Sequence, residues 1–246
     1  EYIYDLKEKQ VYFMEMNTRL QVEHPVTEMV SQVNLVQQQF EIAQGKNIAQ
    51  LPVRFDGHAI EVRVNAERVE VQDNGSLNFV PEPGYVGEVH FPDETHVRVI
   101  SAVEEGSLVP PYYDSMIAQI ICWGSSRKEA CSRMLDYLGK VRLEGISTNL
   151  ALSRMILSDT EFLKGRFDTG FLKGFLERID FNELKSRIEH DSGDSGKGLS
   201  QEELLVPETN EIKVISPQMG GFYLSPSPEE DPFVREGQVI DIEQPI

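Results

Sequence analysis

The sequence has few cysteines and no long hydrophobic run. Cys122 and Cys131 lack the paired short spacings of a zinc site and are too few for a disulfide scaffold, so we expect reduced, buried thiols. No stretch of about 18 apolar residues predicts a transmembrane helix, and no charged-then-apolar leader predicts a signal peptide. We therefore expect a soluble, cytoplasmic protein without a membrane partner.

Basic side chains are scarce as well. The 246 residues include 23 Lys and Arg against 41 Asp and Glu, which gives a formal net charge of −18. Nucleic acids and anionic membranes require clustered Lys and Arg, so neither is an expected partner. With 40% hydrophobic residues, the chain can bury a substantial core. It starts at Glu1, without Met and directly in a strand pattern, so we expect a segment of a longer protein.

Both helices and strands are predicted. Residues 2–6 and 11–16 form a plausible β-hairpin, and residues 58–65 alternate strictly between apolar and polar, as a half-buried strand does. A further buried strand is predicted over residues 115–123. Helical spacing of apolar residues predicts helices over residues 27–44, 126–141, 149–157 and 170–179.

The last quarter of the chain has a different composition. Residues 183–246 carry half of the net negative charge, and residues 190–198 (HDSGDSGKG) contain no apolar side chain. This composition is typical of a flexible linker, which we place at residues 183–210. Residues 211–246 read as short strands separated by Pro and Gly, consistent with a small β domain.

Polar residues occupy every odd position from residue 15 to residue 23. In an extended chain these side chains would share one face: Glu15, Asn17, Arg19, Gln21 and Glu23. A solvated surface strand is the ordinary alternative. Two carboxylates, two amides and a guanidinium, placed directly before a predicted helix, instead favour a functional site.

The residue types in this segment suggest its chemistry. Oxygens of Glu15 and Asn17 suit a hard divalent cation such as Mg²⁺ or Mn²⁺. Arg19 offers a planar fork for an oxyanion, and Glu23 is a candidate general base. A straight strand would span roughly 26 Å, so the chain either bends near residues 18–20 or lines a long cleft. Metal-assisted phosphoryl transfer to a small acid is the predicted reaction.

Five motifs occur in the order found in biotin carboxylases, which are ATP-grasp enzymes. They are FMEMNTRLQVEHPVTE (13–28), HAIEVRVNAE (58–67), NFVPEPG (78–84), PPYYDSMIAQII (110–121) and GISTN (145–149). The resemblance covers about residues 1–180 and implies an α+β fold. Residues 1–45 would be the C-terminal part of an ATP-grasp domain. Residues 46–182 would be the biotin carboxylase C-terminal domain, an antiparallel sheet with helices.

The resemblance also implies the ligands of individual residues. Two Mg²⁺ or Mn²⁺ ions and the substrate ATP would be held by Glu1, Glu15 and Asn17. Bicarbonate would be bound by Arg19, Gln21, Glu23 and the backbone of Val22.

Three of these residues would be catalytic. The resemblance implies that Glu23 deprotonates bicarbonate for attack on the γ-phosphate of ATP, with Arg19 beside it. The carboxyphosphate would break down to CO₂ and phosphate, and Arg63 would bind biotin and stabilise its ureido oxygen. For Arg63 alone, an ordinary ion pair with Glu61 is the simpler reading. Two positions depart from the family pattern: Gln119, where Lys is usual, and Ile100, where an acidic residue is usual.

Residues 211–246 resemble the first half of a biotin carboxyl carrier domain of acetyl-CoA carboxylase type, an all-β fold of the biotinyl/lipoyl kind. The segment stops before the Met-Lys-Met turn of that family, and Lys213 is not at the corresponding position. The biotin attachment lysine is therefore expected to be absent from this chain, and the half domain to be loosely packed.

The resemblance predicts the biotin carboxylase component of an acyl-CoA carboxylase. Acetyl-CoA is favoured, as in fatty acid biosynthesis, because the linker is short and the tail is carrier-like. The expected partners are ATP, bicarbonate, a biotinylated carrier domain, a second copy of the chain and carboxyltransferase subunits. The glycine-rich loop and lysines that bind ATP in this family have no counterpart, so the isolated chain is expected to be inactive. Three alternatives stay open: a non-catalytic interaction module, another biotin-dependent carboxylase, and a different ATP-grasp ligase.

Overall fold

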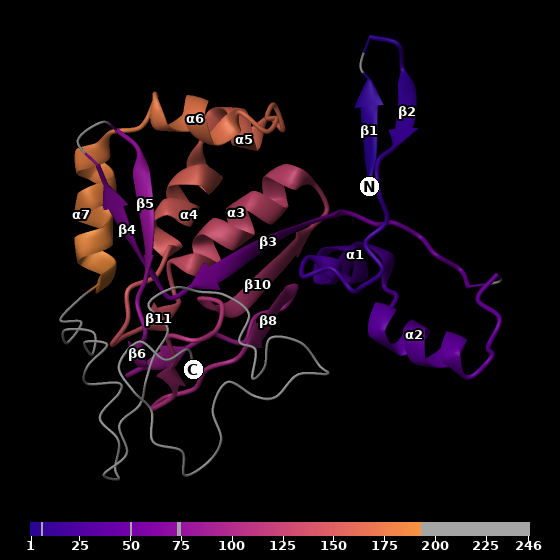
Figure 1. Ribbon diagram of the computed structural model, residues 1–246, viewed down its shortest axis with the longest axis horizontal. Coiled ribbons are helices and arrows are strands. Elements are labelled where there is room, and N and C mark those ends of the chain that lie inside the picture. Colours follow the sequence, from indigo (N-terminus) through magenta and orange to yellow (C-terminus); the bar gives the residue numbers. More distant parts are fainter. Residues whose placement is uncertain (6, 50, 73–74, 193–246) are drawn as a thin grey trace, which may run out of the picture. The chain divides into compact units, whose positions relative to one another are not determined.

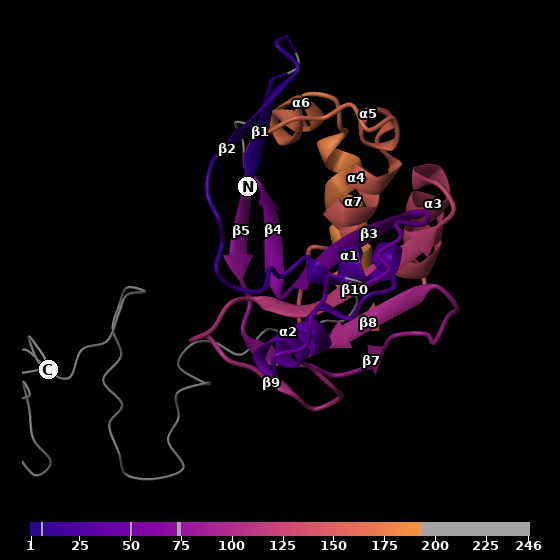
Figure 2. The same cartoon turned by 90° about the vertical axis from the view of Figure 1, so that its right-hand side faces the viewer.

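A computed structural model describes residues 1–5, 7–49, 51–72 and 75–192 (Figures 1 and 2). The predicted half carrier domain at residues 211–246 lies outside the described residues, as do residues 193–210 of the predicted linker. The strands are β1 Tyr2–Asp5, β2 Gln10–Phe13, β3 His58–Asn65, β4 Glu67–Val71, β5 Leu77–Pro81, β6 Gly84–Tyr85, β7 Val89–His90, β8 Val97–Ser101, β9 Leu108–Val109, β10 Met116–Gly124 and β11 Arg142–Leu143. The helices are α1 His24–Ser31, α2 Leu35–Ala43, α3 Arg127–Leu138, α4 Leu150–Ser158, α5 Thr160–Leu163, α6 Phe171–Leu176 and α7 Phe181–Ser192.

A three-stranded antiparallel sheet in the order β3-β10-β8 organises the described part of the chain. Strand β10 pairs Ile120 with Val62 of β3 on one side and with Val99 of β8 on the other. Four further two-stranded pairs are formed: β1-β2, β4-β5, β6-β9 and β7-β11. The mixed helix and antiparallel sheet content agrees with the predicted α+β class.

The alternation of side chains gives the central sheet two different faces. One face packs with α3 into the main hydrophobic core, where Val62, Ile120 and Met134 are buried. The strict alternation in residues 58–65 predicts this face, and the burial of β3 confirms it. The opposite face contacts α1 (Figure 1) and carries polar side chains. The two predicted buried thiols, Cys122 and Cys131, are free and lie in the main core.

The single helix predicted over residues 27–44 is wrong, because the chain forms two helices there. Gln32 adopts a left-handed conformation with φ of 58°, which ends α1. The side chain of Asn34 then accepts a hydrogen bond from the backbone N–H of Gln37 and caps α2. The apolar periodicity continues through this break, so it gave no sign of the interruption.

A buried carboxylate holds the junction between α1 and α2 on the sheet. Glu28 accepts hydrogen bonds from the backbone N–H of Leu35 at 2.7 Å and from Nη1 of Arg98 on β8 at 2.6 Å. Burial opposes the charge of Glu28, but the two hydrogen bonds and the positive charges of Arg98 and His24 together outweigh it and lower its pKa. Helix α1, which begins directly after residue 23, is thereby fixed against β8.

The C-terminal helices form a second, smaller cluster. Ala151 and Leu152 of α4 pack there with Phe175 of α6 and Leu184 of α7. Helix α7 occupies the first ten residues of the segment predicted as a linker, because Leu184 and Ile188 recur at helical spacing and anchor it. Among the helices described, none has both the length and the hydrophobicity that crossing a membrane requires.

Truncating a side chain at the centre of β10 tests the importance of this sheet for stability. Ile120 is 0% exposed, so Ile120→Ala should lower the free energy of unfolding by about 3 kcal/mol. The same change at Ile42, which is 48% exposed on α2, should cost less than about 0.5 kcal/mol. Urea unfolding followed by circular dichroism measures both, and equal losses would contradict the assigned core.

Candidate active site

The polar face of the sheet brings together side chains from two strands. Glu61 and Arg63 stand two residues apart on β3, and Gln119 on β10 lies directly opposite Arg63 in the antiparallel register. Because cross-strand partners share a face, all three point toward the side that α1 covers. Pairing of β3 with β10 therefore creates a polar patch under the start of α1.

The segment predicted as an extended strand, residues 15–23, is irregular instead. Strand β2 ends at Phe13, Arg19 lies in a bend, and a turn precedes α1, which starts at His24 with Pro25 in its first turn. The straight-strand alternative is therefore wrong, and the predicted bend near residues 18–20 is confirmed. Pro25 is pre-organised for a helix start and cannot extend a strand ladder.

One contact joins this segment to the sheet through two predicted catalytic residues. Nη2 of Arg63 donates a hydrogen bond to Oε2 of Glu23 at 2.9 Å, although the residues are 40 positions apart. Both side chains are about half exposed, so the ion pair contributes at most about 1 kcal/mol to stability. A ligand can therefore reach the pair and displace it at low cost. The other predicted partner of Arg63 is Glu61, whose Oε1 lies 3.7 Å from Nε of Arg63.

Glu61 is an unusual carboxylate because its side chain is only 6% exposed. Oε1 accepts a hydrogen bond from Nε2 of Gln119 at 3.1 Å, whereas Oε2 is buried and has no hydrogen-bond partner among the described residues. Burial raises the pKa of Glu61, against the hydrogen bond from Gln119 and the positive charge of Arg63. The same amide of Gln119 donates to the backbone carbonyl of Val22 at 2.7 Å.

The other predicted bicarbonate ligands lie earlier on the same segment. Nη1 of Arg19 is 3.4 Å from the carbonyl of Leu20 and 3.5 Å from Oε1 of Gln21, both of which are long contacts. The guanidinium of Arg19 therefore retains donors for an oxyanion. Arg19 and Gln21 thus lie together, as do Glu23 and Arg63.

The predicted metal ligands are brought together in part. Nδ2 of Asn17 donates to Oε1 of Glu1 at 2.9 Å, which leaves Oδ1 of Asn17 as a potential ligand. The β1-β2 register places Glu1 opposite Met14, one residue before Glu15. Two carboxylates and an amide oxygen are nevertheless the donor types that Mg²⁺ prefers, so the residues fit such an ion chemically.

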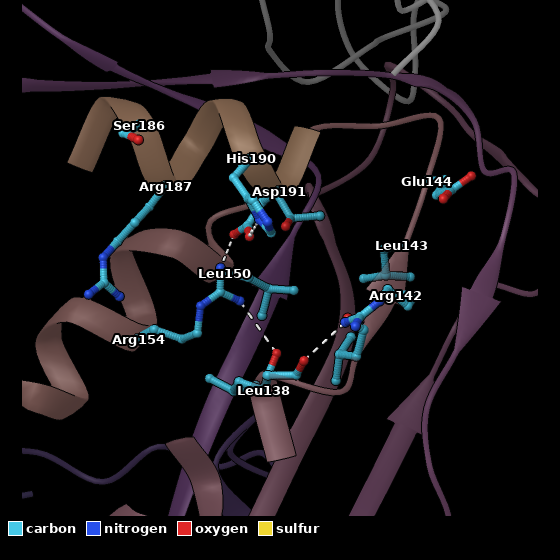
Figure 3. A pocket seen from close by; sticks show the side chains of 13 residues that line it. Leu138, Arg142, Leu143, Glu144, Leu150, Arg154, Ser186, Arg187, His190 and Asp191 are labelled. Atoms are coloured by element: carbon cyan, nitrogen blue, oxygen red, sulfur yellow. Dashed lines mark hydrogen bonds and ion pairs between the residues drawn. The ribbon is translucent and has the colours of Figure 1, made fainter. Parts of the chain in front are cut away.

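A separate cavity of about 680 Å³ lies between α3, α4, α7 and β11 (Figure 3). Its basic side chains are already engaged. Arg154 pairs with Asp191, Arg187 donates to Glu183, and Arg142 donates to backbone carbonyls at 2.9 and 3.0 Å. No predicted site residue lines this cavity, so the candidate site is the polar patch beside α1.

Sequence reasoning assigned no chemical role to Gln119. The surrounding residues of β10, MIAQIICWG, read as a buried apolar strand, and both hydrogen-bond partners of Gln119 are far away in the sequence. Glu61 appeared only as an alternative partner of Arg63. Two signals were available in the sequence: a polar residue inside an otherwise apolar strand, since buried polar groups require partners, and the departure from the Lys that is usual at this position.

Comparison with known proteins shows which protein families the chain resembles. Residues 61–174 match the family described as biotin carboxylase C-terminal domain, and residues 1–51 match the carbamoyl-phosphate synthase L chain, ATP binding domain. Segments of the chain are therefore similar to both domains. The chain is homologous to biotin carboxylases, which are ATP-dependent ligases.

Three relatives make this homology specific. Biotin carboxylase 1 of Bacillus subtilis (strain 168) is 45% identical over 177 residues, which are 71% of this chain and 38% of that protein. Biotin carboxylase of Haemophilus influenzae is 42% identical over 185 residues, which are 74% of this chain and 39% of that protein.

The third relative is a solved structure, the biotin carboxylase domain dimer of Hydrogenobacter thermophilus 2-oxoglutarate carboxylase, in complex with MgADP, ADP and bicarbonate. It is 36% identical to this chain, with a TM-score of 0.63, over 73% of this chain and 39% of that chain. The chain thus spans less than two fifths of the length of each of these three proteins.

The buried carboxylate gives a pH-dependent prediction. The pKa of Glu61 is raised in the folded state above its ordinary value of 4.5, so the folded protein binds this proton more tightly than the unfolded chain. Stability linked to Glu61 is present below pH 4.5 and is lost as the pH rises through the raised value. Glu61→Gln should therefore gain stability relative to the unmodified protein between pH 4.5 and pH 8. Thermal unfolding across this range measures the difference in stability between the two proteins. A difference that does not vary with pH would contradict the raised pKa of Glu61.

Proposed function

We propose that this chain supplies the bicarbonate and biotin side of a biotin carboxylase active site. The reaction is the ATP- and bicarbonate-dependent carboxylation of carrier-bound biotin through carboxyphosphate. It takes place in a protein in which the rest of the ATP-binding domain is also present. The observation that carries the proposal is the Glu23–Arg63 contact at 2.9 Å, which joins the ATP-grasp segment to the biotin carboxylase C-terminal domain.

Bicarbonate is bound on the segment that leads into α1. Arg19 offers its guanidinium fork to the carboxylate-like oxygens, while Gln21 and the backbone of Val22 complete the binding site. The relative from Hydrogenobacter thermophilus, whose structure contains bicarbonate, supports this choice of substrate. Glu1, Glu15 and Asn17 would hold Mg²⁺, which would neutralise charge on the phosphates of ATP.

Glu23 is the general base. Its Oε2 accepts a hydrogen bond from Arg63, so Oε1 remains to take the proton of bicarbonate as its oxygen attacks the γ-phosphorus of ATP. The bond from the γ-phosphorus to the bridging oxygen breaks, and ADP leaves. Carboxyphosphate then separates into CO₂ and phosphate, and the phosphate accepts the proton of the biotin ureido nitrogen.

Arg63 acts on biotin. Loss of the ureido proton places negative charge on the ureido oxygen, and the permanently charged guanidinium of Arg63 stabilises it. Only Nη2 of Arg63 contacts Glu23, so Nη1 is available to this oxygen. The ureido nitrogen then attacks CO₂ to give carboxybiotin.

The wider setting follows from the sequence of the tail. Residues 211–246 resemble the carrier of acetyl-CoA carboxylase, so we assign acetyl-CoA as the final acceptor of the carboxyl group. A biotinylated carrier domain, a second copy of the chain and carboxyltransferase subunits complete the proposed assembly. The dimer of the Hydrogenobacter thermophilus relative supports the homodimer.

Replacing the base tests the proposal in the longer protein that includes the complete ATP-binding domain. Glu23→Gln keeps the size of the side chain but cannot take a proton, so bicarbonate-dependent ATP cleavage should fall by at least about 100-fold. ADP release measured by a coupled assay reports the rate, and binding of a fluorescent nucleotide should be unchanged.

The matched control is Glu105→Gln, an exposed carboxylate on the loop between β8 and β9, which should retain full activity. Near-normal ATP cleavage by Glu23→Gln would exclude Glu23 as the base.

A further inference from the structure

The three carbonyl groups that precede α1 are held in two different ways. The carbonyls of Gln21 and Glu23 accept hydrogen bonds from the local N–H groups of His24 at 3.2 Å and Val26 at 3.1 Å. The carbonyl of Val22 instead accepts a hydrogen bond from Gln119, which lies 97 residues later on β10. The peptide between Val22 and Glu23 is therefore tied directly to the sheet.

This tie fixes more than one atom. Because the peptide unit is planar, holding the carbonyl of Val22 also fixes the direction of the N–H of Glu23. The Cα of Glu23 belongs to the same plane, so the root of the catalytic side chain is held as well. Gln119 thus controls where the proposed base and the proposed Val22 backbone site lie relative to the sheet.

The orientation of the Gln119 amide is itself determined by its neighbours. Gln119 is 9% exposed, and its nitrogen contacts two acceptors, the carbonyl of Val22 at 2.7 Å and Oε1 of Glu61 at 3.1 Å. Turning the amide over would place its oxygen against both acceptors, so only one orientation is favourable. Glu61 therefore helps to hold the amide of Gln119 in this orientation.

The same residues form a closed ring of contacts. The amide nitrogen of Gln119 contacts both the carbonyl of Val22 and Oε1 of Glu61. Oε1 of Glu61 lies 3.7 Å from Nε of Arg63. Arg63 in turn donates to Glu23, which follows Val22 in the chain. Removal of the amide donor would therefore disturb Glu23 through its backbone and also through Arg63.

We propose that Gln119 is a positioning residue of the bicarbonate site, which holds the Val22–Glu23 peptide on the sheet while Glu61 fixes its amide. The positioning role rests on the proposed function, whereas the tie itself does not. Gln119 touches no reacting atom, and it acts through Val22 and Glu23.

Kinetics in the longer protein with the complete ATP-binding domain test the positioning role. Gln119→Met matches the length of Gln119 but has no donor, so the KM for bicarbonate should rise about tenfold while the KM for ATP stays unchanged. Gln119→Lys supplies N–H donors at a similar reach to the same two oxygens, and it should keep the KM for bicarbonate within about threefold of the original value.

A control on the same strand separates positioning from packing. Ile121 is 0% exposed and faces the same side of β10, so Ile121→Val should lower stability slightly without changing the KM for bicarbonate. An equal rise in the KM for bicarbonate in Ile121→Val and Gln119→Met would contradict the positioning role. A KM for bicarbonate in Gln119→Lys as high as in Gln119→Met would also contradict it.

Amide hydrogen exchange in the 246-residue chain tests the tie without any activity. In Gln119→Met, the N–H groups of His24 and Val26 should exchange faster, because the Val22–Glu23 peptide, which lies between the two carbonyls that they contact, is no longer held on the sheet. Exchange in Gln119→Lys should match the unmodified chain. Unchanged exchange in Gln119→Met would show that Gln119 does not hold the Val22–Glu23 peptide on the sheet. This result does not depend on activity. A failure of the proposed function would instead appear as a lack of bicarbonate-dependent activity in the unmodified longer protein.

Discussion

Antiparallel pairing of β10 with β3 on one side and β8 on the other is the constraint on which the rest of the described structure depends. The register sets Ile120 against Val62 and Val99 on one face, and Gln119 against Arg63 on the other. Because the side-chain period is two, a slip of one residue would exchange these faces. The apolar face must be buried under α3, so the polar face is presented to α1 and to the segment before it.

The polar face combines groups that differ greatly in their effect on the stability of the folded protein. Within the described part of the chain, Glu61 is buried with one oxygen unpaired, an arrangement that opposes folding at neutral pH. The Glu23–Arg63 ion pair, in contrast, is exposed and contributes little to stability. Neither feature is explained by stability alone. A buried carboxylate that orients Gln119, beside an exposed pair that a ligand can open, is consistent with a site whose groups are held in place for chemistry.

The sequence predicted the features that depend on local pattern. Alternation in residues 58–65 predicted the two faces of β3 and placed Arg63 on the polar one, and the motif around Glu23 is the basis of the proposed site. It failed where contacts outside the periodic pattern decide the backbone. Residues 15–23 alternate like a strand, yet they pair with no other strand among the described residues and bend at Arg19. The break at Gln32 depends on Asn34 and the buried Glu28, and the role of Gln119 depends on partners 58 and 97 residues away.

The central claim is that residues from two segments form one bicarbonate site beside α1. Titration of the isotopically labelled 246-residue chain with bicarbonate at constant pH and ionic strength, followed by nuclear magnetic resonance, tests it most directly. The account predicts saturable shifts with one common Kd at the guanidinium groups of Arg19 and Arg63 and at the backbone amides of Val22 and Glu23. Shifts confined to the cavity arginines Arg142, Arg154 and Arg187, or equal shifts with chloride, would contradict it.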